Sequence, residues 1–417
     1  MKVILTLGYG RLHLVQSAQR LADLGVKVRL VIGWIPKNVD GFLVRLASRL
    51  QGRNLAMGMK KRLVAHHPNI EVRQMPLVEA FDASVRLVLR RCHCSMTKWS
   101  VLAWRLWGFF SRRFITKDAQ VFHARSGAGQ GGAIAKAKRL GLKVLVDHSI
   151  AHPAFMEAHL RPEFERYGVP FDIGISSPFW QLVDKDCREA DVVMVNSFFV
   201  RDTFVEAGYA PEKIRVVYQG TREDFFGLRT ELPPYDGGRP LRILFTGGFG
   251  FRKGGEYILA ALKELKARGV AFEMDVVGSY GGAESIRAQY GADAMPIRFH
   301  GPVPQDDLKE FLQKADVYLF PSLAEGCASS GLEAMAAGLC VVATHESGLP
   351  IADGETGYLV PSKDSAAIVD RLAWLVAHPN AVDQTGRAAA RLIASDYTWS
   401  AYAANVKKIY EDLAGMR

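Results

Sequence analysis

The sequence contains no run of 18 or more apolar residues, the length that would suggest a membrane-spanning helix. Its first apolar run, Val3–Leu7, is too short for the core of a signal peptide and predicts a buried strand. We find no internal repeat of short period and no low-complexity segment.

Cysteine is also scarce, with five residues at scattered positions. An odd, scattered set argues against a disulfide framework and favours a reduced, cytoplasmic protein. Only Cys92-His93-Cys94 brings possible metal ligands together, and no second ligand pair lies nearby. A zinc site there is the less favoured alternative, because structural zinc normally needs four ligands.

What the sequence does have is the composition of a globular protein, with 49% hydrophobic and 23% charged residues. Its 417 residues exceed the size of one ordinary core and predict two domains of about 200 residues each. The 53 Lys and Arg outnumber the 43 Asp and Glu by ten. This surplus favours a polyanionic partner, which could be a nucleotide, a nucleic acid or an acidic membrane surface.

Short apolar runs alternate with helical patterns along the chain, which is typical of βαβ units and a parallel sheet. The predicted strands are Val3–Leu7, Lys27–Ile32, Ile70–Gln74, Gln120–Ala124, Lys143–Asp147, Asp191–Val195, Arg215–Tyr218, Arg242–Thr246, Glu273–Gly278, Ile297–Gly301, Val317–Phe320 and Cys340–Thr344. The fold class expected is therefore α/β, with two doubly wound Rossmann-like domains facing across a cleft.

The boundary between the two domains is marked by turn-forming residues. Residues 228–240 contain two adjacent prolines and two adjacent glycines before a fresh strand, and read as a linker. We therefore divide the chain into residues 1–227, the linker, residues 241–395 and a terminal segment, 396–417. Apolar residues at helical spacing over Trp399–Leu413 predict a helix that must dock on a neighbour.

One segment departs from the alternating pattern. Val85–Phe114 combines three tryptophans and several phenylalanines with clustered arginines. Such a helix suits the interface of an anionic bilayer, so an anionic membrane surface is a possible partner. The alternative is a helix that packs on its neighbours and shows its arginines to water. Both interpretations stay open from the sequence.

Two glycine-rich loops carry the chemistry. The first, Thr246–Gly255, follows a predicted strand, opens a helix and contains Arg252 and Lys253. Free backbone amides, a helix N-terminus and two full positive charges suit a phosphate ligand. The loop lacks both a Walker sequence and a Gly-x-Gly-x-x-Gly fingerprint, and an ordinary strand-to-helix turn remains the alternative.

The second loop, Phe320–Gly338, places Glu325 before Gly326 and Glu333 in a helix that begins near Gly331. Ser330-x-x-Glu333 is also a capping-box pattern, in which Glu333 would bond to the backbone of the capping residue. Capping explains Glu333 and does not explain Glu325, a carboxylate in a loop of small and apolar residues.

Glu325 and Glu333, separated by seven residues, resemble the E-x7-E signature of the retaining nucleotide-sugar glycosyltransferases of family 4, which share the GT-B fold. Four further passages resemble that family in the expected order. They are Ala190–Ser197, Val217–Gly220, Arg252–Gly254 and His300–Val303. The resemblance is strong over residues 187–417 and weaker over the first half. One position departs from it, because Gly248 stands where the family commonly has arginine.

The resemblance implies an acceptor bound by residues 1–227 and a donor nucleotide bound mainly by residues 241–395. The terminal segment would form a helix that crosses back to the first domain. The implied site residues are Arg252, Lys253, Ser329 and Ser330 for the diphosphate, Glu333 for the ribose, Gly301 and Val303 for the base, Gly8, Gly10, Gly326 and Cys327 near the donor sugar, and Glu325 and His148 as catalytic residues. A buried, structural histidine is the alternative for His148.

The function implied is retaining transfer of a hexose from a UDP- or GDP-linked donor to a glycan or lipid-linked acceptor, in polysaccharide or glycoconjugate synthesis. No metal, other cofactor or nucleic-acid partner is expected. The protein would be cytoplasmic, and a peripheral location at the inner face of the membrane is compatible with this expectation. Asp184-Lys185-Asp186 resembles a metal-binding Asp-x-Asp but lies in a helical run, and we interpret it as surface charge.

A dinucleotide oxidoreductase is disfavoured because His13 replaces the expected third glycine. A non-catalytic scaffold that binds polyanions or membranes is the alternative function.

Overall fold

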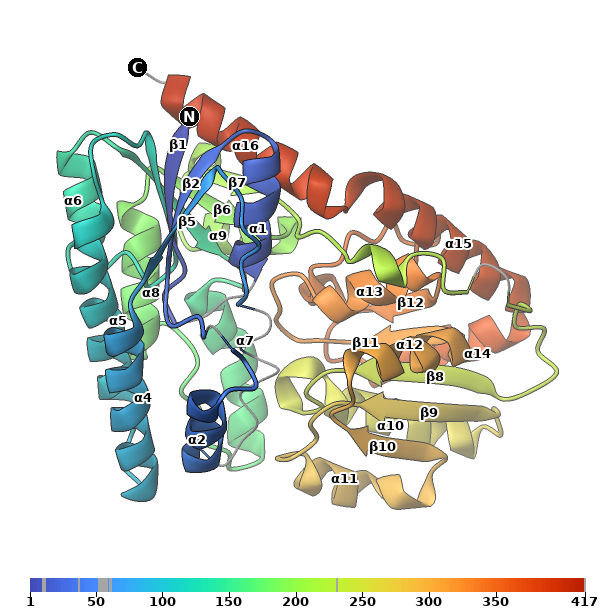
Figure 1. Ribbon diagram of the computed structural model, residues 1–417. Coiled ribbons are helices and arrows are strands. Elements are labelled where there is room, and N and C mark those ends of the chain that lie inside the picture. Colours follow the sequence, from blue (N-terminus) through green and yellow to red (C-terminus); the bar gives the residue numbers. More distant parts are fainter. Residues whose placement is uncertain (10–12, 37, 52–58, 60–61, 230–231, 416–417) are drawn as a thin grey trace.

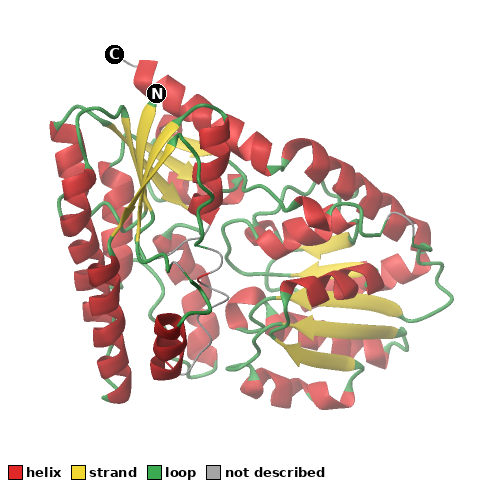
Figure 2. Ribbon diagram, viewed as in Figure 1, coloured by secondary structure: helices red, strands yellow, loops and turns green. Residues whose placement is uncertain are grey.

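The computed structural model describes residues 1–9, 13–36, 38–51, 59, 62–229 and 232–415. Figure 1 shows two α/β halves side by side, joined at one end by a long C-terminal helix. Helices cover the faces of both sheets, as Figure 2 shows. The predicted fold class, two doubly wound halves, is confirmed.

In the first half, the described residues form a seven-stranded parallel sheet in the order β3-β2-β1-β4-β5-β6-β7. Its strands are β1 Lys2–Thr6, β2 Lys27–Ile32, β3 Ile70–Gln74, β4 Val121–Arg125, β5 Lys143–His148, β6 Val192–Val195 and β7 Ile214–Val216. Its helices are α1 His13–Asp23, α2 Phe42–Gln51, α4 Pro76–Arg91, α5 Thr97–Ser111, α6 Ala133–Arg139, α7 Pro153–Arg166, α8 Pro178–Glu189 and α9 Phe198–Glu206.

In the second half, six parallel strands lie in the order β10-β9-β8-β11-β12-β13. They are β8 Leu241–Thr246, β9 Phe272–Val277, β10 Ile297–Gly301, β11 Val317–Phe320, β12 Cys340–Ala343 and β13 Tyr358–Leu359. The helices are α10 Gly255–Ala267, α11 Glu284–Tyr290, α12 Gln305–Lys314, α13 Ser329–Ala337, α14 Ser365–Ala377, α15 Pro379–Asp396 and α16 Trp399–Gly415.

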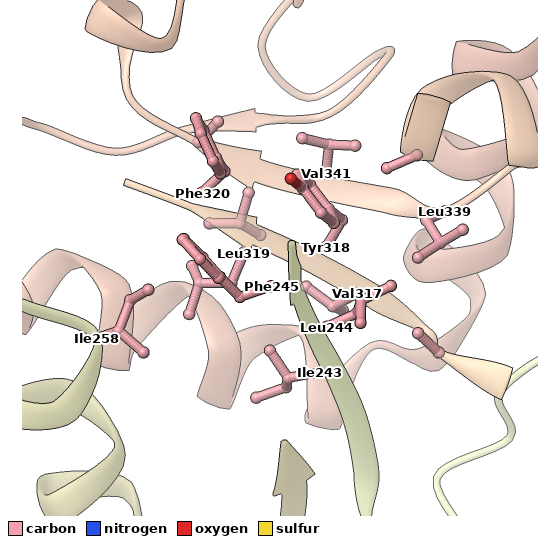
Figure 3. Packing of buried hydrophobic residues seen from close by; sticks show 14 of the residues in the cluster. Ile243, Leu244, Phe245, Ile258, Val317, Tyr318, Leu319, Phe320, Leu339 and Val341 are labelled. Atoms are coloured by element: carbon pink, nitrogen blue, oxygen red, sulfur yellow. The ribbon is translucent and has the colours of Figure 1, made fainter. Parts of the chain in front are cut away.

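Strands β8, β11 and β12 of the second half are buried along almost their whole length, which explains why they appear in the sequence as apolar runs. Figure 3 shows the residues of β8 and β11 lying together with Ile258 of α10 and Val341 of β12. Four predicted strands have the predicted bounds, and the others shift by one or two residues. Strand β13 was missed because two residues are too short to show a pattern.

Helix α16 returns from the second half and packs against α1 of the first half, as expected from its spacing. Val406, Tyr410 and Leu413 are buried in the same core cluster as Val3 and Leu5 of β1. The hydroxyl of Tyr410 lies 2.6 Å from Nδ1 of His123, and burial lowers the pKa of that imidazole to about 4. The domain boundaries drawn from the sequence stay a proposal, which this arrangement supports.

The aromatic segment Val85–Phe114 forms the end of α4, all of α5 and the short turn after it. Trp104 and Trp107 are buried in the core, and Nε1 of Trp107 donates to Oγ1 of Thr6 at 2.9 Å. These two tryptophans therefore favour the packing alternative for this part of the segment, because they fill the space beneath β1 and β4. Phe81, Leu102, Phe109 and Phe110 on the same two helices are exposed. No helix of the described residues is long and apolar enough to cross a bilayer.

We expect Trp107→Ala to lower the free energy of unfolding by about 3–5 kcal/mol, because it opens a cavity in a fully buried site. Phe109→Ala, on the same helix but half exposed, should lower it by about 1 kcal/mol or less. Urea unfolding of both variants measures the difference. Equal, small effects would show that α5 is not anchored through Trp107.

Candidate active site

The predicted acidic and basic side chains meet at the carboxyl edge of the second sheet. Arg252 and Lys253 lie in a short 3-10 turn after β8, and Glu325 follows β11. A guanidinium nitrogen of Arg252 is 2.7 Å from Oε1 of Glu325, and Nζ of Lys253 is 3.5 Å from the same oxygen. The cluster therefore holds two cations on one carboxylate.

Lys253 is held in a largely buried position. Only 18% of its side chain is exposed, and its ammonium lies 4.8 Å from the centre of the Phe320 ring. Burial lowers the pKa of Lys253, and the neighbouring Glu325 opposes that shift by favouring the charged form. Arg252 also donates to the carbonyl of Ala324 at 2.8 Å, which fixes it against the loop that carries Glu325.

The loop that carries Glu325 docks directly on the first half. The carbonyl of Glu325 accepts from the backbone N–H of Ala151 at 3.0 Å, and the carbonyl of Gly326 accepts from Oγ of Ser197 at 2.5 Å. A Cβ at Gly326 would lie 2.1 Å from the carbonyl oxygen of Ser149, so this approach needs glycine. Cys327 next to it is buried, and burial raises the pKa of its thiol.

His148 ends β5, one residue before Ser149. Its ring is buried, Nδ1 lies 3.0 Å from Oγ of Ser126, and the ring packs edge-on against Phe204. The strand end thus lies beside the docked Gly326 loop. Its environment also fits the alternative of a structural histidine, and its catalytic role stays a proposal.

Helix α13 starts at Ser329, two residues earlier than predicted. Its capping residue is Ala328, which makes no side-chain capping bond, so the predicted capping box with Ser330 is wrong. Oγ of Ser330 instead accepts from the hydroxyl of Tyr318 at 2.8 Å. Glu333 lies one turn into the helix and is half-buried.

Ser329 and Glu333 line a hollow of about 520 Å³ between the halves. The first half contributes His13 and Gln16 of α1 to the same hollow, and Gln305 lines it from the start of α12. Gly301 and Val303 lie just before Gln305, at the end of β10, where the sequence placed the base region. Ligand pockets commonly have volumes of 300–1,000 Å³, so the hollow is large enough for a small molecule.

The remaining predicted glycines belong to the loop after β1. Gly8, two residues after that strand, takes a positive φ of 63°, and a Cβ there would lie 2.2 Å from the Trp104 ring. Gly10 lies outside the described residues.

Sequence reasoning missed a buried pair at the hollow. Nε2 of His13 is 2.9 Å from Oδ2 of Asp147, the residue before His148 in β5. The available signal was an acidic residue inside a buried strand, which needs a partner. Its partner, at the start of α1, is 134 positions away in the chain.

A second missed set joins α7 to the other half. The carboxylate of Glu163 accepts from the hydroxyl of Tyr257 at 2.8 Å and pairs with Nζ of Lys363 at 3.1 Å. Arg166 bridges Glu163 and Glu256, which belong to different halves. Figure 1 shows α7 lying between the two sheets, where these bonds form.

The interpretation of Asp184-Lys185-Asp186 as surface charge is wrong for both carboxylates. Asp184 is buried beside His152 and Tyr209, while Asp186 is fully buried. Asp186 accepts from the backbone N–H groups of Gly127 and Gly129 and from the amide of Gln130. It thereby holds the loop after β4, whose first residue, Ser126, contacts His148.

The exposed Cys92 and Cys94 lie at the end of α4. Within the described residues, no three His, Cys, Asp or Glu side chains gather in a way that could hold a metal ion.

Two parallel sheets with docked carboxyl edges, a returning C-terminal helix and an acid–base cluster between them define a protein of the GT-B class. Residues 240–378 match the family profile of the glycosyl transferases group 1. The match covers a third of the chain and lies within its second half, where Arg252, Lys253, Glu325 and Glu333 also lie.

Among curated relatives, the putative colanic acid biosynthesis glycosyltransferase WcaL of Salmonella typhimurium is 32% identical over 197 residues, which are 45% of this chain and 48% of that protein. The chain spans about half the length of the curated relatives it matches.

Two solved structures share the fold over nearly the whole of both chains. The sucrose-phosphate synthase of Thermosynechococcus elongatus has a TM-score of 0.64 at 18% identity and covers 99% of each chain. HepE of Anabaena, in complex with UDP and glucose, has a TM-score of 0.59 at 15% identity and covers 99% of this chain and 100% of its own.

We expect the free energy of unfolding of the native protein to fall, relative to that of Asp186→Asn, as pH rises from about 4 to about 7. Burial raises the pKa of Asp186 to about 7, above the value of about 3.9 in an unfolded chain. In this window the folded state keeps a proton that the unfolded state has lost. The contribution is complete below about pH 4 and disappears as pH rises through 7, at most about 1.4 kcal/mol per pH unit.

Chemical denaturation of both proteins at pH 4, 5, 6 and 7 measures this difference. The other titrating groups are common to the two proteins, so their contributions cancel in the difference between the two free energies of unfolding. A difference that does not change with pH would contradict the burial of a neutral carboxyl at this position.

Proposed function

We propose that the protein is a retaining hexosyltransferase that uses a UDP- or GDP-linked sugar and needs no metal ion. The main support is that Arg252 and Lys253 both pair with Glu325, whose loop is docked on the first half. The match of residues 240–378 to the group 1 family and the UDP and glucose bound by HepE support a nucleotide-sugar donor. The transferred sugar would enter polysaccharide or glycoconjugate synthesis.

The donor diphosphate would bind Arg252, Lys253 and the backbone amides at the start of α13, at Ser329 and Ser330. These cations and the partial positive charge of the helix end neutralise the leaving group, which removes the need for a metal. Glu333, which lines the hollow beside Ser329, would bind the ribose hydroxyls.

Glu325 changes partners in this proposal. In the structure its carboxylate pairs with Arg252 and Lys253. A diphosphate competes for the same cations and releases the carboxylate toward the hydroxyls of the donor sugar. There it stabilises the positive charge that develops at the anomeric carbon. His148 would face the sugar from the end of β5.

The acceptor would bind to residues 1–227, beside the loop after β1, and would be a glycan or a lipid-linked glycan. We also propose that the protein is cytoplasmic and works at the inner face of an anionic membrane. The exposed apolar side chains of α4 and α5, flanked by arginines, support this peripheral placement.

A thermal-shift screen against UDP, GDP, ADP and their sugars tests donor binding, because a ligand that binds only the folded state raises its apparent stability. We expect a shift with UDP or GDP sugars that persists in the presence of EDTA. Absence of any shift with all of them, together with binding of generic polyanions, would favour the non-catalytic scaffold instead.

Two variants separate binding from chemistry. Lys253→Met should weaken nucleotide binding about 10- to 100-fold, since it removes a charged hydrogen-bond donor of roughly 1.5–3 kcal/mol. Glu325→Gln should leave nucleotide affinity equal or higher, because it frees Arg252 and Lys253 for the diphosphate. It should lower donor hydrolysis about 100-fold or more, which corresponds to roughly 2.7 kcal/mol or more of transition-state stabilisation. Lys314→Met, on the exposed face of α12, is the matched control for charge. Equal losses of binding in the Glu325 and Lys253 variants would refute the division of roles.

A further inference from the structure

A groove of about 600 Å³ lies between α4 and α5, on the outer side of the first half. Its walls come from the residues just after β3, from the first turns of α4, and from one face of α5. The main side chains are Leu77, Phe81, Trp99, Leu106, Phe110 and Tyr9. Apart from Arg113 and the polar ends of Tyr9 and Trp99, these side chains are apolar.

The polar atoms in the groove already have partners within the protein. Nε1 of Trp99 donates to Oδ1 of Asp82 at 2.9 Å, and the hydroxyl of Tyr9 donates to the carbonyl of Ala103 at 3.1 Å. Asp82 itself is buried and pairs with Arg86 at 2.8 Å. With these bonds made, the groove offers a ligand mainly hydrocarbon contacts.

The groove is open, and its apolar side chains face water. Leu77 is 83% exposed and Phe81 is 55% exposed, although both lie beside apolar neighbours. Contiguous exposed apolar surface of this kind marks a binding site in soluble proteins.

The exposed charged side chains of α4, α5 and the turn after them are all positive. Arg90, Arg91, Lys98, Arg105 and Arg113 are exposed on the two helices and the turn after them. Both acids of the same segment are engaged elsewhere, Asp82 as above and Glu79 with Arg62 and the backbone of Trp34. The surface therefore suits an amphiphile that carries negative charge.

One end of the groove reaches the loop after β1. Tyr9 directly follows Gly8, and its ring packs edge-on against Trp104 and Trp107. Trp104 in turn underlies Gly8 and Gly127, at the ends of β1 and β4. A chain lying in the groove thus ends beside the edge of the sheet where the proposed site is built.

We propose that this groove binds a single hydrocarbon chain of the acceptor, which is therefore a lipid with an anionic headgroup. The proposal rests on the transferase function above and names its acceptor class. Tyr9 marks the headgroup end, next to the site, and the chain lies along the face of α5 formed by Leu106 and Phe110. The exposed cations draw the headgroup from an anionic membrane.

Butyl, octyl and dodecyl phosphate, each below its micelle concentration, test the groove directly. Titration followed by tryptophan fluorescence, with calorimetry as a second readout, gives the affinity. We expect affinity to rise with chain length, by up to about fourfold per methylene, the equivalent of about 0.8 kcal/mol per buried CH₂. Equal affinity for the three chains would show that only the phosphate is bound and would overturn the proposal.

Two variants in the groove and two control variants outside it test where the alkyl phosphate binds. Leu77→Gln and Phe110→Ser alter the groove, while Leu102→Gln and Phe109→Ser alter exposed apolar residues on α5 that do not line it. The first two should weaken dodecyl phosphate binding at least fivefold, and the other two by less than twofold. Equal losses in all four variants would mean a diffuse membrane-facing surface and would refute a groove for one chain.

A second copy of the chain is the competing occupant. Analytical ultracentrifugation should find the same mass in the native protein and in Leu77→Gln; a dimer in the native protein that Leu77→Gln dissociates would overturn the proposal. The binding assay contains no nucleotide, so it fails or succeeds independently of the donor screen. Chain binding without nucleotide binding would reject the transferase function, and the reverse result would reject the lipid groove alone.

Discussion

The arrangement of the site depends on the docking of one loop. Residues 323–327 emerge from β11 of the second half and bury Leu323 and Ala324 in the core of the first half. Two hydrogen bonds from Ala151 and Ser197 then fix the backbone around Glu325. Because Arg252 bonds to Ala324 in the same loop, the basic and acidic groups are positioned together.

The joint between the halves is reinforced by buried charge rather than by apolar contact alone. Glu163 and Glu256 are nearly fully buried, and each is paired across the joint, through Lys363 and Arg166. A buried carboxylate that loses its partner costs free energy. The halves can therefore separate only if water reaches these groups. Helix α16 adds a covalent and apolar connection on the opposite side, through Tyr410 and its neighbours.

Much of the fold was readable from the sequence because buried parallel strands are continuous apolar runs. The site was readable where its residues follow such strands: Glu325 after β11, Arg252 and Lys253 after β8, and His148 at the end of β5. The errors arose where the partner lies far away in the chain. Asp186 was interpreted as surface charge because its hydrogen-bond donors, at residues 127–130, are more than 50 positions away in the chain.

The tryptophans of α5 also show the limit of what composition alone can indicate. A basic and aromatic helix has the same composition whether it lies on a membrane or packs on a sheet. Only the contacts of Trp104 and Trp107 with Gly8 and Thr6 separate these possibilities, and they leave Phe109 and Phe110 exposed.

The sequence by itself determined the order of strands and helices, the apolar faces and the spacing of Glu325 and Glu333, since these depend on residues close together in the chain. Only the tertiary structure decided which charges are buried, which loops meet and where the open groove lies. The physical reason is that burial and pairing depend on distances in space, and a parallel α/β fold brings together residues far apart in the chain.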